Sequence, residues 1–482
     1  MLDGGSSAGG AIGWAAPPAG ASRRALGARL FALAGSAPVL LAACGPLQRG
    51  GPEASKAAST LAGEVTVMGT TAPAGQAETR WRRLTALFQE RYPRLTLREV
   101  WDPNLYAQRK LEVLMAADSV PETAVLRRQA EIPRLTFFNA ILPLDPYIAK
   151  STVVKKSDYY DKILAMHTLD GKLYVVPHDI FLYVLFYNKD AFAREGLKPP
   201  DLTWDYNDWQ EAAIKLTKTA TGGAAGPRRQ FGVDMPTWWR IHYMGNAGLG
   251  EMEGGVGILP PEKWAVTHDR PETIAAYKWQ QDQWCRYACA VPSADAGDPA
   301  TAAEEGMSFQ NGKAAMQFVG STSAVGFYDR IKDFQWDVTL APLADKKKPR
   351  ITTAIGRGYG LLKGAKNPDG GWAFIELYNE PQRLLEEVRE AGGGLYGSKV
   401  IMESKEFRAS PVPPADKNVW IEGLKTARFF PEPGWELSLV IDTSAVTANI
   451  GDIWRCKASP EAVLRPYGQQ INKLLRERFG GK

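Results

Sequence analysis

The chain has 482 residues, more than one hydrophobic core ordinarily serves, so we expect at least two lobes. Hydrophobic residues make up 45% and charged residues 23%, which is the balance of a globular protein and excludes a disordered chain. The formal net charge is +5, and the longest run of lysines is the short stretch 346–348. So small an excess of positive charge argues against nucleic-acid binding.

The first 44 residues have the composition of an export signal. Arg23 and Arg24 precede an uncharged stretch of 14 residues from Leu30 to Ala43, which ends directly before Cys44. A basic segment followed by a short apolar one is typical of a secretory signal, since a membrane-spanning helix needs roughly 20 residues. The paired arginines resemble a twin-arginine signal, although the general secretory route stays open. Leu-Ala-Ala before Cys44 resembles a lipoprotein lipobox, which implies lipid attachment at this cysteine.

Three further cysteines allow several pairings. Cys285 and Cys289 are four residues apart in a predicted helix, so they share a face on which a mutual disulfide fits poorly. Either can pair with Cys456, and the odd number defines no disulfide framework. The four histidines are scattered without a His-Glu-x-x-His pattern, so we expect no metal site and no cofactor.

From residue 61 the hydrophobic pattern alternates between strand and helix. Strands are predicted at Glu64–Met68, Leu95–Val100 and Thr123–Leu126, separated by helices over about 78–92 and 111–115. This order indicates a parallel sheet, in which ligands bind beyond the carboxyl ends of the strands. The apolar stretch from Leu173 to Tyr187 is interpreted as a strand pair or a crossover into a second lobe. Later helices are predicted at Trp209–Thr217, Pro271–Ala288, Trp372–Tyr378 and Glu461–Phe479.

Six short motifs follow one another along the chain after the export signal. They are Leu87 to Leu97, Gly171 to Pro177, Leu185 to Asp190, Pro199 to Trp209, Phe309 to Met316 and Lys366 to Phe374. In this order they resemble the family 1 extracellular solute-binding proteins, the group that contains the maltose-binding receptors. Most of these residues have local structural roles: Asn188 can cap the next helix, Thr203 resembles a cap before the Trp209 helix, and Gly312 marks a turn.

The resemblance implies an α/β, two-lobe periplasmic-binding-protein fold of the type II kind, with crossover strands and a ligand cleft between the lobes. Residues 1–44 would be the signal peptide with its lipobox and 45–61 a flexible linker. Lobe 1 would comprise 62–180 plus 343–385, and lobe 2 would comprise 181–342 plus 386–482. The implied protein is a monomeric, lipid-anchored receptor on the outer face of the membrane. It would close around a carbohydrate and deliver it to the permease of an ABC importer.

A sugar site combines aromatic rings with hydrogen-bonding charged and polar groups. Trp101 and the Trp238-Trp239 pair can equally be core residues, and His178-Asp179 can be a hinge turn. Arg357 stands between glycines, which permit a close backbone approach, although a solvated loop arginine fits too. Candidates from the predicted strand ends and turns are Thr70, Thr71, Trp101, Arg127, His178, Asp179, Trp238, Trp239, Ser321, Arg357 and Tyr359.

Three other functions fit parts of the sequence. A secreted glycoside hydrolase needs only two carboxylates at a cleft, but beyond the predicted export signal we find no Gly-x-Ser-x-Gly and no P-loop, so we expect no enzyme. A binding protein for a glycerol phosphate ester, peptide or polyamine is the second, and Arg127 and Arg357 favour an anionic ligand over a polyamine. The third is a structural surface lipoprotein without solute.

Overall fold

The computed structural model describes residues 60–480 except 71, 75, 104, 106–109, 129–130, 220–227, 257, 293–307, 392–393, 444–445 and 447–448. The predicted export signal, Cys44, nearly all of the predicted linker and Thr71 lie outside the described residues. No described helix is both long enough and apolar enough to cross a lipid bilayer.

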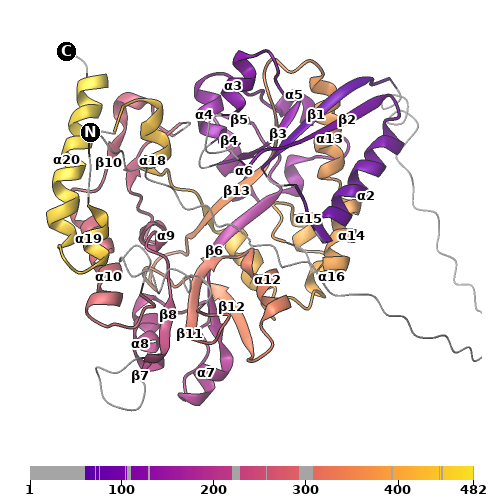
Figure 1. Cartoon of the computed structure of the whole chain (residues 1–482). Helices are drawn as coiled ribbons and strands as arrows, with labels where there is room; N and C mark the ends of the chain where they lie inside the picture. The colour runs from indigo at the N-terminus through magenta and orange to yellow at the C-terminus, as the bar shows by residue number, and fades with distance from the viewer. Residues whose placement is uncertain are drawn as a thin grey trace, which may run out of the picture. The chain divides into compact units, whose positions relative to one another are not determined.

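The predicted βαβαβ segment at the start of the described chain is confirmed (Figure 1). Strand β1 (Gly63–Gly69) pairs in parallel with β2 (Leu95–Trp101) on one side and β3 (Thr123–Arg127) on the other. Helices α2 (Gln76–Arg91) and α3 (Lys110–Ala116) are the crossovers that parallel neighbours require. The carboxyl ends of β1 and β2 therefore lie side by side at Gly69 and Trp101.

Two long strands connect this group of strands to a second one. The first residues of β6 (Asp179–Asn188) pair with β13 (Thr352–Leu361), and its later residues pair with β11 (Ala314–Gly320) and β12 (Trp336–Leu340). The last residues of β13 pair with β3. The crossover predicted within 173–187 is thus confirmed. The parallel pairing predicted for the first three strands is confirmed, whereas the sheet as a whole is mixed because these later pairings are antiparallel.

Three further strands belong to this ten-stranded sheet. β8 (Arg228–Asp234) pairs in parallel with β11, and β7 (Lys218–Thr219) follows at the end of the sheet. The short β14 (Ala427–Arg428) pairs with β13.

The predicted later helices are confirmed with shifts of a few residues. They are α8 (Tyr206–Leu216), α10 (Pro271–Cys285), α13 (Pro368–Tyr378) and α20 (Pro460–Phe479). Asn188 caps α7 (Lys189–Arg194) by accepting a hydrogen bond from the Ala191 N–H, as predicted. The prediction of Thr203 as the α8 cap is wrong, since Asp205 accepts the hydrogen bonds at that end and forms a capping box with Asp208.

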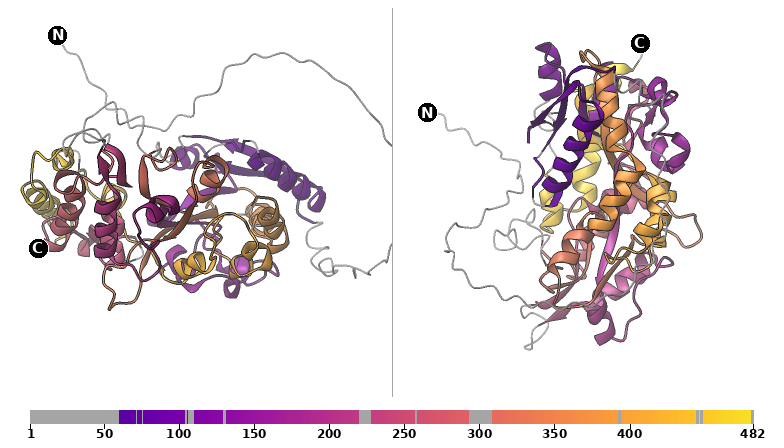
Figure 2. Two further views of the ribbon diagram at one scale, coloured as in Figure 1. Left: turned by 90° about the horizontal axis from the view of Figure 1, so that it is seen from below. Right: turned by 90° about the vertical axis from the view of Figure 1, so that its right-hand side faces the viewer.

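Separate apolar clusters hold the two strand groups. Helices α2 and α13 pack with β1 in a cluster that includes the buried Phe88 and Phe374, and the second view of Figure 2 shows the two helices side by side. In the second group, Trp209 of α8 and Phe318 of β11 are fully buried in one core. Each crossover strand contributes to one of these cores, since Leu361 of β13 belongs to the first and Leu185 of β6 belongs to the second.

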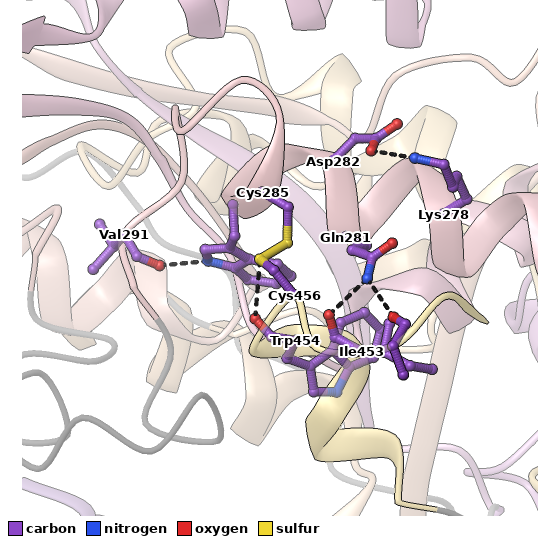
Figure 3. The surroundings of a disulfide bond; sticks show 10 residues. Lys278, Gln281, Asp282, Cys285, Val291, Ile453, Trp454 and Cys456 are labelled. Atoms are coloured by element: carbon purple, nitrogen blue, oxygen red, sulfur yellow. Dashed lines mark hydrogen bonds and ion pairs between the residues drawn. A yellow bond between two sulfur atoms is a disulfide. The ribbon is translucent and has the colours of Figure 1, made fainter. Parts of the chain in front are cut away.

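A disulfide attaches the C-terminal helices to α10. Cys285 at the end of α10 bonds to Cys456, the second residue after α19 (Ile450–Trp454) (Figure 3). Cys289 is buried outside any disulfide. Tyr277, Ile453, Trp454 and Leu464 form a small buried cluster beside it. Of the two pairings that the sequence left open for Cys456, the structure has the one with Cys285.

Candidate ligand-binding site

A pocket of 440 Å³ lies where the carboxyl ends of β1 and β2 meet the start of β6 and the end of β13. Its volume is in the range of small-molecule sites. α12 (Ser323–Arg330), which follows β11 of the second strand group, contributes Val325 to its wall. The other lining residues are Gly69, Thr70, Pro73, Ala77, Arg80, Trp81, Leu84, Trp101, Val125, His178, Asp179, Arg357, Tyr359, Tyr378, Arg383, Glu387, Gly394 and Tyr396.

Alternating glycines on β13 direct two side chains to the pocket. A Cβ at Gly358 would be 2.0 Å from the Val176 carbonyl oxygen, and one at Gly356 would be 2.6 Å from the His167 ring. Side chains of a strand alternate between its two faces. The glycines lie on the face that packs closely against Val176 and His167, and Arg357 and Tyr359 lie on the opposite face, toward the pocket. The close approach expected of this glycine-rich stretch is therefore confirmed.

An ion pair links the two crossover strands at the pocket. Arg357 lies opposite Asp179 in the β13–β6 register, and its Nε donates to Asp179 Oδ2 at 2.8 Å. Burial alone would raise the pKa of Asp179, but the charge of Arg357 and the hydrogen bond from its guanidinium outweigh burial and hold that pKa below its ordinary value. About a third of each paired side chain is exposed, 37% for Arg357 and 32% for Asp179, so both can contact a ligand.

Aromatic rings form one wall of the pocket. Trp81 and Trp101 meet edge to face with ring centroids 4.9 Å apart, and Tyr359 meets Tyr378 at 4.8 Å. Trp101 can lie over the end of β1 because residue 69 is glycine, where a Cβ would be 2.4 Å from its ring. Two partly exposed tryptophans thus present apolar ring surface beside the Asp179–Arg357 pair.

His178 is buried behind this pair. Its Nδ1 lies 3.1 Å from Asn379 Oδ1, and its ring lies against Tyr378 with centroids 4.2 Å apart. Burial lowers its pKa, although the charge of Asp179 acts in the opposite direction, so the imidazole is neutral near pH 7. This histidine directly precedes β6 and adds no charge to the pocket.

The structure brings six of the predicted site residues to this pocket and leaves four described ones outside its lining. The six are Thr70, Trp101, His178, Asp179, Arg357 and Tyr359. Arg127 lies beside Arg357 in the sheet, with its guanidinium bound to Glu131 through two hydrogen bonds. Ser321 is buried, and its Oγ accepts a hydrogen bond from the Leu182 N–H. Trp239 is fully buried against Phe318, which is the core interpretation that the sequence allowed.

Trp238 lies farther along the same face of the crossover strands. Asp179, Phe181 and Tyr183 alternate on one partly exposed face of β6, and Tyr183 meets Trp238 with centroids 5.5 Å apart. The five residues from Asp179 to Tyr183 span about 13 Å of strand, since each of the four steps between them advances roughly 3.3 Å. Trp238 is 39% exposed and therefore available to a ligand longer than the pocket.

Sequence reasoning missed several lining residues. The sequence places Trp81 and Arg80 in the predicted helix over about 78–92 and indicates no ligand contact for either residue. Tyr378, Arg383 and Glu387 come from α13 and α14 (Pro381–Ala391), about 300 residues after β1 in the chain. Only the position of Arg80 and Trp81, just after a strand-end loop, was a usable signal. Among the described residues, no group of three or more metal-ligating side chains occurs.

Known proteins identify the class of this fold. The sequence profile described as bacterial extracellular solute-binding protein matches residues 72–382. The ABC substrate-binding protein Lmo0181 of Listeria monocytogenes, solved in complex with cycloalternan, is 19% identical with a TM-score of 0.66 over 85% of this chain and 98% of that one. The sugar-binding protein MalE of Xanthomonas citri is 18% identical with a TM-score of 0.67 over 86% and 98%.

A third similar structure holds a different ligand. UgpB of Mycobacterium tuberculosis, in complex with glycerophosphocholine, is 16% identical with a TM-score of 0.66 over 86% of this chain and 99% of that one. At these identities the likeness concerns the fold, which is the predicted α/β, two-lobe periplasmic-binding-protein fold. Because the profile matches more than half of the chain and nearly the whole of each similar structure is covered, the protein belongs to the bacterial extracellular solute-binding proteins.

Proposed function

We propose that this protein is the exported receptor of an ABC importer and binds a carbohydrate in the pocket described above. The observation that carries the proposal is the presence of Trp81 and Trp101 beside the Asp179–Arg357 pair in one pocket. Sugars have apolar C–H faces that stack on aromatic rings and hydroxyl groups that bind carboxylates and guanidinium groups. Two of the three similar structures described above are named for sugar binding or contain an oligosaccharide, which supports the same ligand class.

Binding without chemistry is the second part of the proposal. Asp179 is engaged by Arg357, and Glu387 by Arg383, so the pocket's two carboxylates are held by arginines in a way that suits recognition. A glycosidase instead needs one protonated acid and one nucleophile or base at the scissile bond. We expect purified protein to bind saccharides and to release no shorter products, as checked by chromatography of the incubated sugar.

Closure of two lobes is the proposed response to the solute. Lobe 1 would comprise 62–180 plus 343–385 and lobe 2 would comprise 181–342 plus 386–482, with β6 and β13 as the connection. Solute would stabilise the closed form because it contacts both lobes only there. Small-angle scattering should show a smaller radius of gyration with the bound sugar, and an unchanged radius would contradict hinge closure.

The cellular location and the monomeric state of the receptor are also proposals. The lipobox before Cys44 supports attachment to the outer face of the membrane, where a monomeric receptor would meet its permease. Replacement of Cys44 by alanine should move the protein from the membrane fraction to the soluble fraction. Recovery of this variant in the membrane fraction would contradict the lipid anchor.

Calorimetric titration with neutral, acidic and phosphorylated sugars and with glycerophosphodiesters tests the ligand class. Asp179→Asn should weaken binding of the best sugar by about tenfold or more, because the charged partner of Arg357 is lost. Asp161→Asn is the matched control, since that carboxylate is 96% exposed and does not line the pocket. Failure of every sugar to bind would refute carbohydrate recognition while leaving the family unchanged.

A further inference from the structure

We infer that the solute carries an anionic group, a carboxylate or a phosphate, which binds at Arg80 in the pocket. This inference rests on the proposed carbohydrate-binding function and narrows it to a charged saccharide. It follows from the distribution of charge in the pocket wall, which contains three arginines and two carboxylates.

Both carboxylates already have partners. Asp179 accepts a hydrogen bond from Arg357 at 2.8 Å, and Glu387 forms an ion pair with Arg383 within α14. The Arg383 guanidinium is further fixed because its Nε donates to the Leu377 carbonyl oxygen at 3.1 Å. These two pairs leave the positive charge of Arg80 without a compensating charge in the lining.

Arg80 differs from the other arginines of its helix. Arg82 forms an ion pair with Glu78, and Arg83 forms one with Glu390 of α14. Within the part of the chain that the structure describes, no hydrogen bond or ion pair engages the Arg80 side chain. It is nevertheless half-buried, where a charge interacts more strongly with a ligand than it would in bulk water.

The groups beside Arg80 do not cancel its charge. His178 is neutral, so it adds neither a negative charge that would cancel that of Arg80 nor a second positive charge. The indole Nε1 of Trp81, the next residue, is buried and has no acceptor among the described residues. The Arg80 guanidinium is therefore the donor group that the pocket wall presents to acceptor oxygens of a ligand. Carboxylates and phosphates supply such oxygens, and an arginine can bind either through two hydrogen bonds.

The arrangement also places the anionic group relative to the sugar ring. Trp81 and Trp101 offer ring surface to the apolar face of a sugar, and Arg80 directly precedes Trp81 on the same turn of α2. The saccharide would therefore present its charged substituent toward the start of α2, while its hydroxyl groups reach the Asp179–Arg357 pair.

Matched ligand pairs test the inference by calorimetry on the full protein. Glucose and galactose oligomers are compared with the corresponding glucuronate and galacturonate oligomers and with glucose 6-phosphate. An anionic member should bind at least about tenfold more tightly than its neutral analogue, and its affinity should fall between 50 and 500 mM NaCl. The acidic and phosphorylated arms identify which anion the pocket takes.

Two variants assign the effect to Arg80. Arg80→Gln should weaken the anionic ligand by about tenfold to one-hundredfold and change the neutral analogue by less than about twofold. Arg82→Gln, on the same helix but outside the pocket lining, should leave both affinities unchanged. Equal or tighter binding of neutral sugars would overturn the inference and leave carbohydrate binding intact. Absence of binding by all saccharides would overturn the proposed function itself.

Discussion

Removal of the Cys285–Cys456 disulfide should destabilise the protein strongly. The bond closes a loop across a sequence separation of 171 residues, so it restricts the unfolded chain over more than a third of its length. The chain-entropy relation for a loop of this size gives about 5 kcal/mol, and native disulfides commonly contribute about 2–4 kcal/mol. We therefore expect the double variant Cys285→Ser, Cys456→Ser to lose about 2–5 kcal/mol of unfolding free energy.

Chemical denaturation with and without a reductant measures this loss. Reduction should lower the denaturation midpoint of the wild-type protein and leave that of the double variant unchanged. Cys289→Ser is the matched control because this cysteine is buried outside the disulfide and donates to Gln283 Oε1, a bond that a serine hydroxyl can replace. Its unfolding free energy should fall by less than about 1 kcal/mol.

One pattern of results would refute this reasoning. If the double variant unfolds at the wild-type midpoint and reduction has no effect on either protein, the disulfide does not constrain the unfolded chain. A loss in the double variant without any effect of reduction would instead assign the loss to packing beside α10. Either result would remove the loop-closure explanation.

Three further predictions concern acid stability, packing and recognition. Burial lowers the pKa of His167 to about 4. The stability that depends on a neutral His167 is therefore present above about pH 6.5 and is lost as the pH falls toward 4. In His167→Gln the unfolding free energy should fall less steeply between these two pH values. Gly232→Ala should cost more than about 2 kcal/mol in denaturation, because its Cβ would be 2.0 Å from the Ala213 carbonyl oxygen. Trp238→Ala should leave the thermal midpoint nearly unchanged and weaken longer oligosaccharides more than monosaccharides in calorimetry.

Local patterns in the sequence determined much of the fold. Alternation of apolar residues identifies β1, β2 and β3, and helical periodicity identifies α2, α13 and α20, because both signals come from neighbouring residues that share one face. The antiparallel pairing of β6 with β13 has no such local signal. It depends on contacts between residues more than 170 positions apart, so the mixed sheet was not predicted.

Some residues of the pocket could likewise be predicted from local sequence patterns, and others could not. Thr70 and Trp101 could be predicted because the carboxyl ends of parallel strands form ligand sites, and Arg357 because glycines surround it. The sequence could not separate Trp238, which is partly exposed, from its neighbour Trp239, which is fully buried, since successive aromatic residues have the same local pattern. Nor could it show that Arg383 neutralises Glu387 while Arg80 keeps its charge. By itself, the sequence determined the family and the strand ends at which a ligand can bind. Only the tertiary structure decided which side chains meet there and which charges they cancel, because helices from distant parts of the chain form the pocket wall.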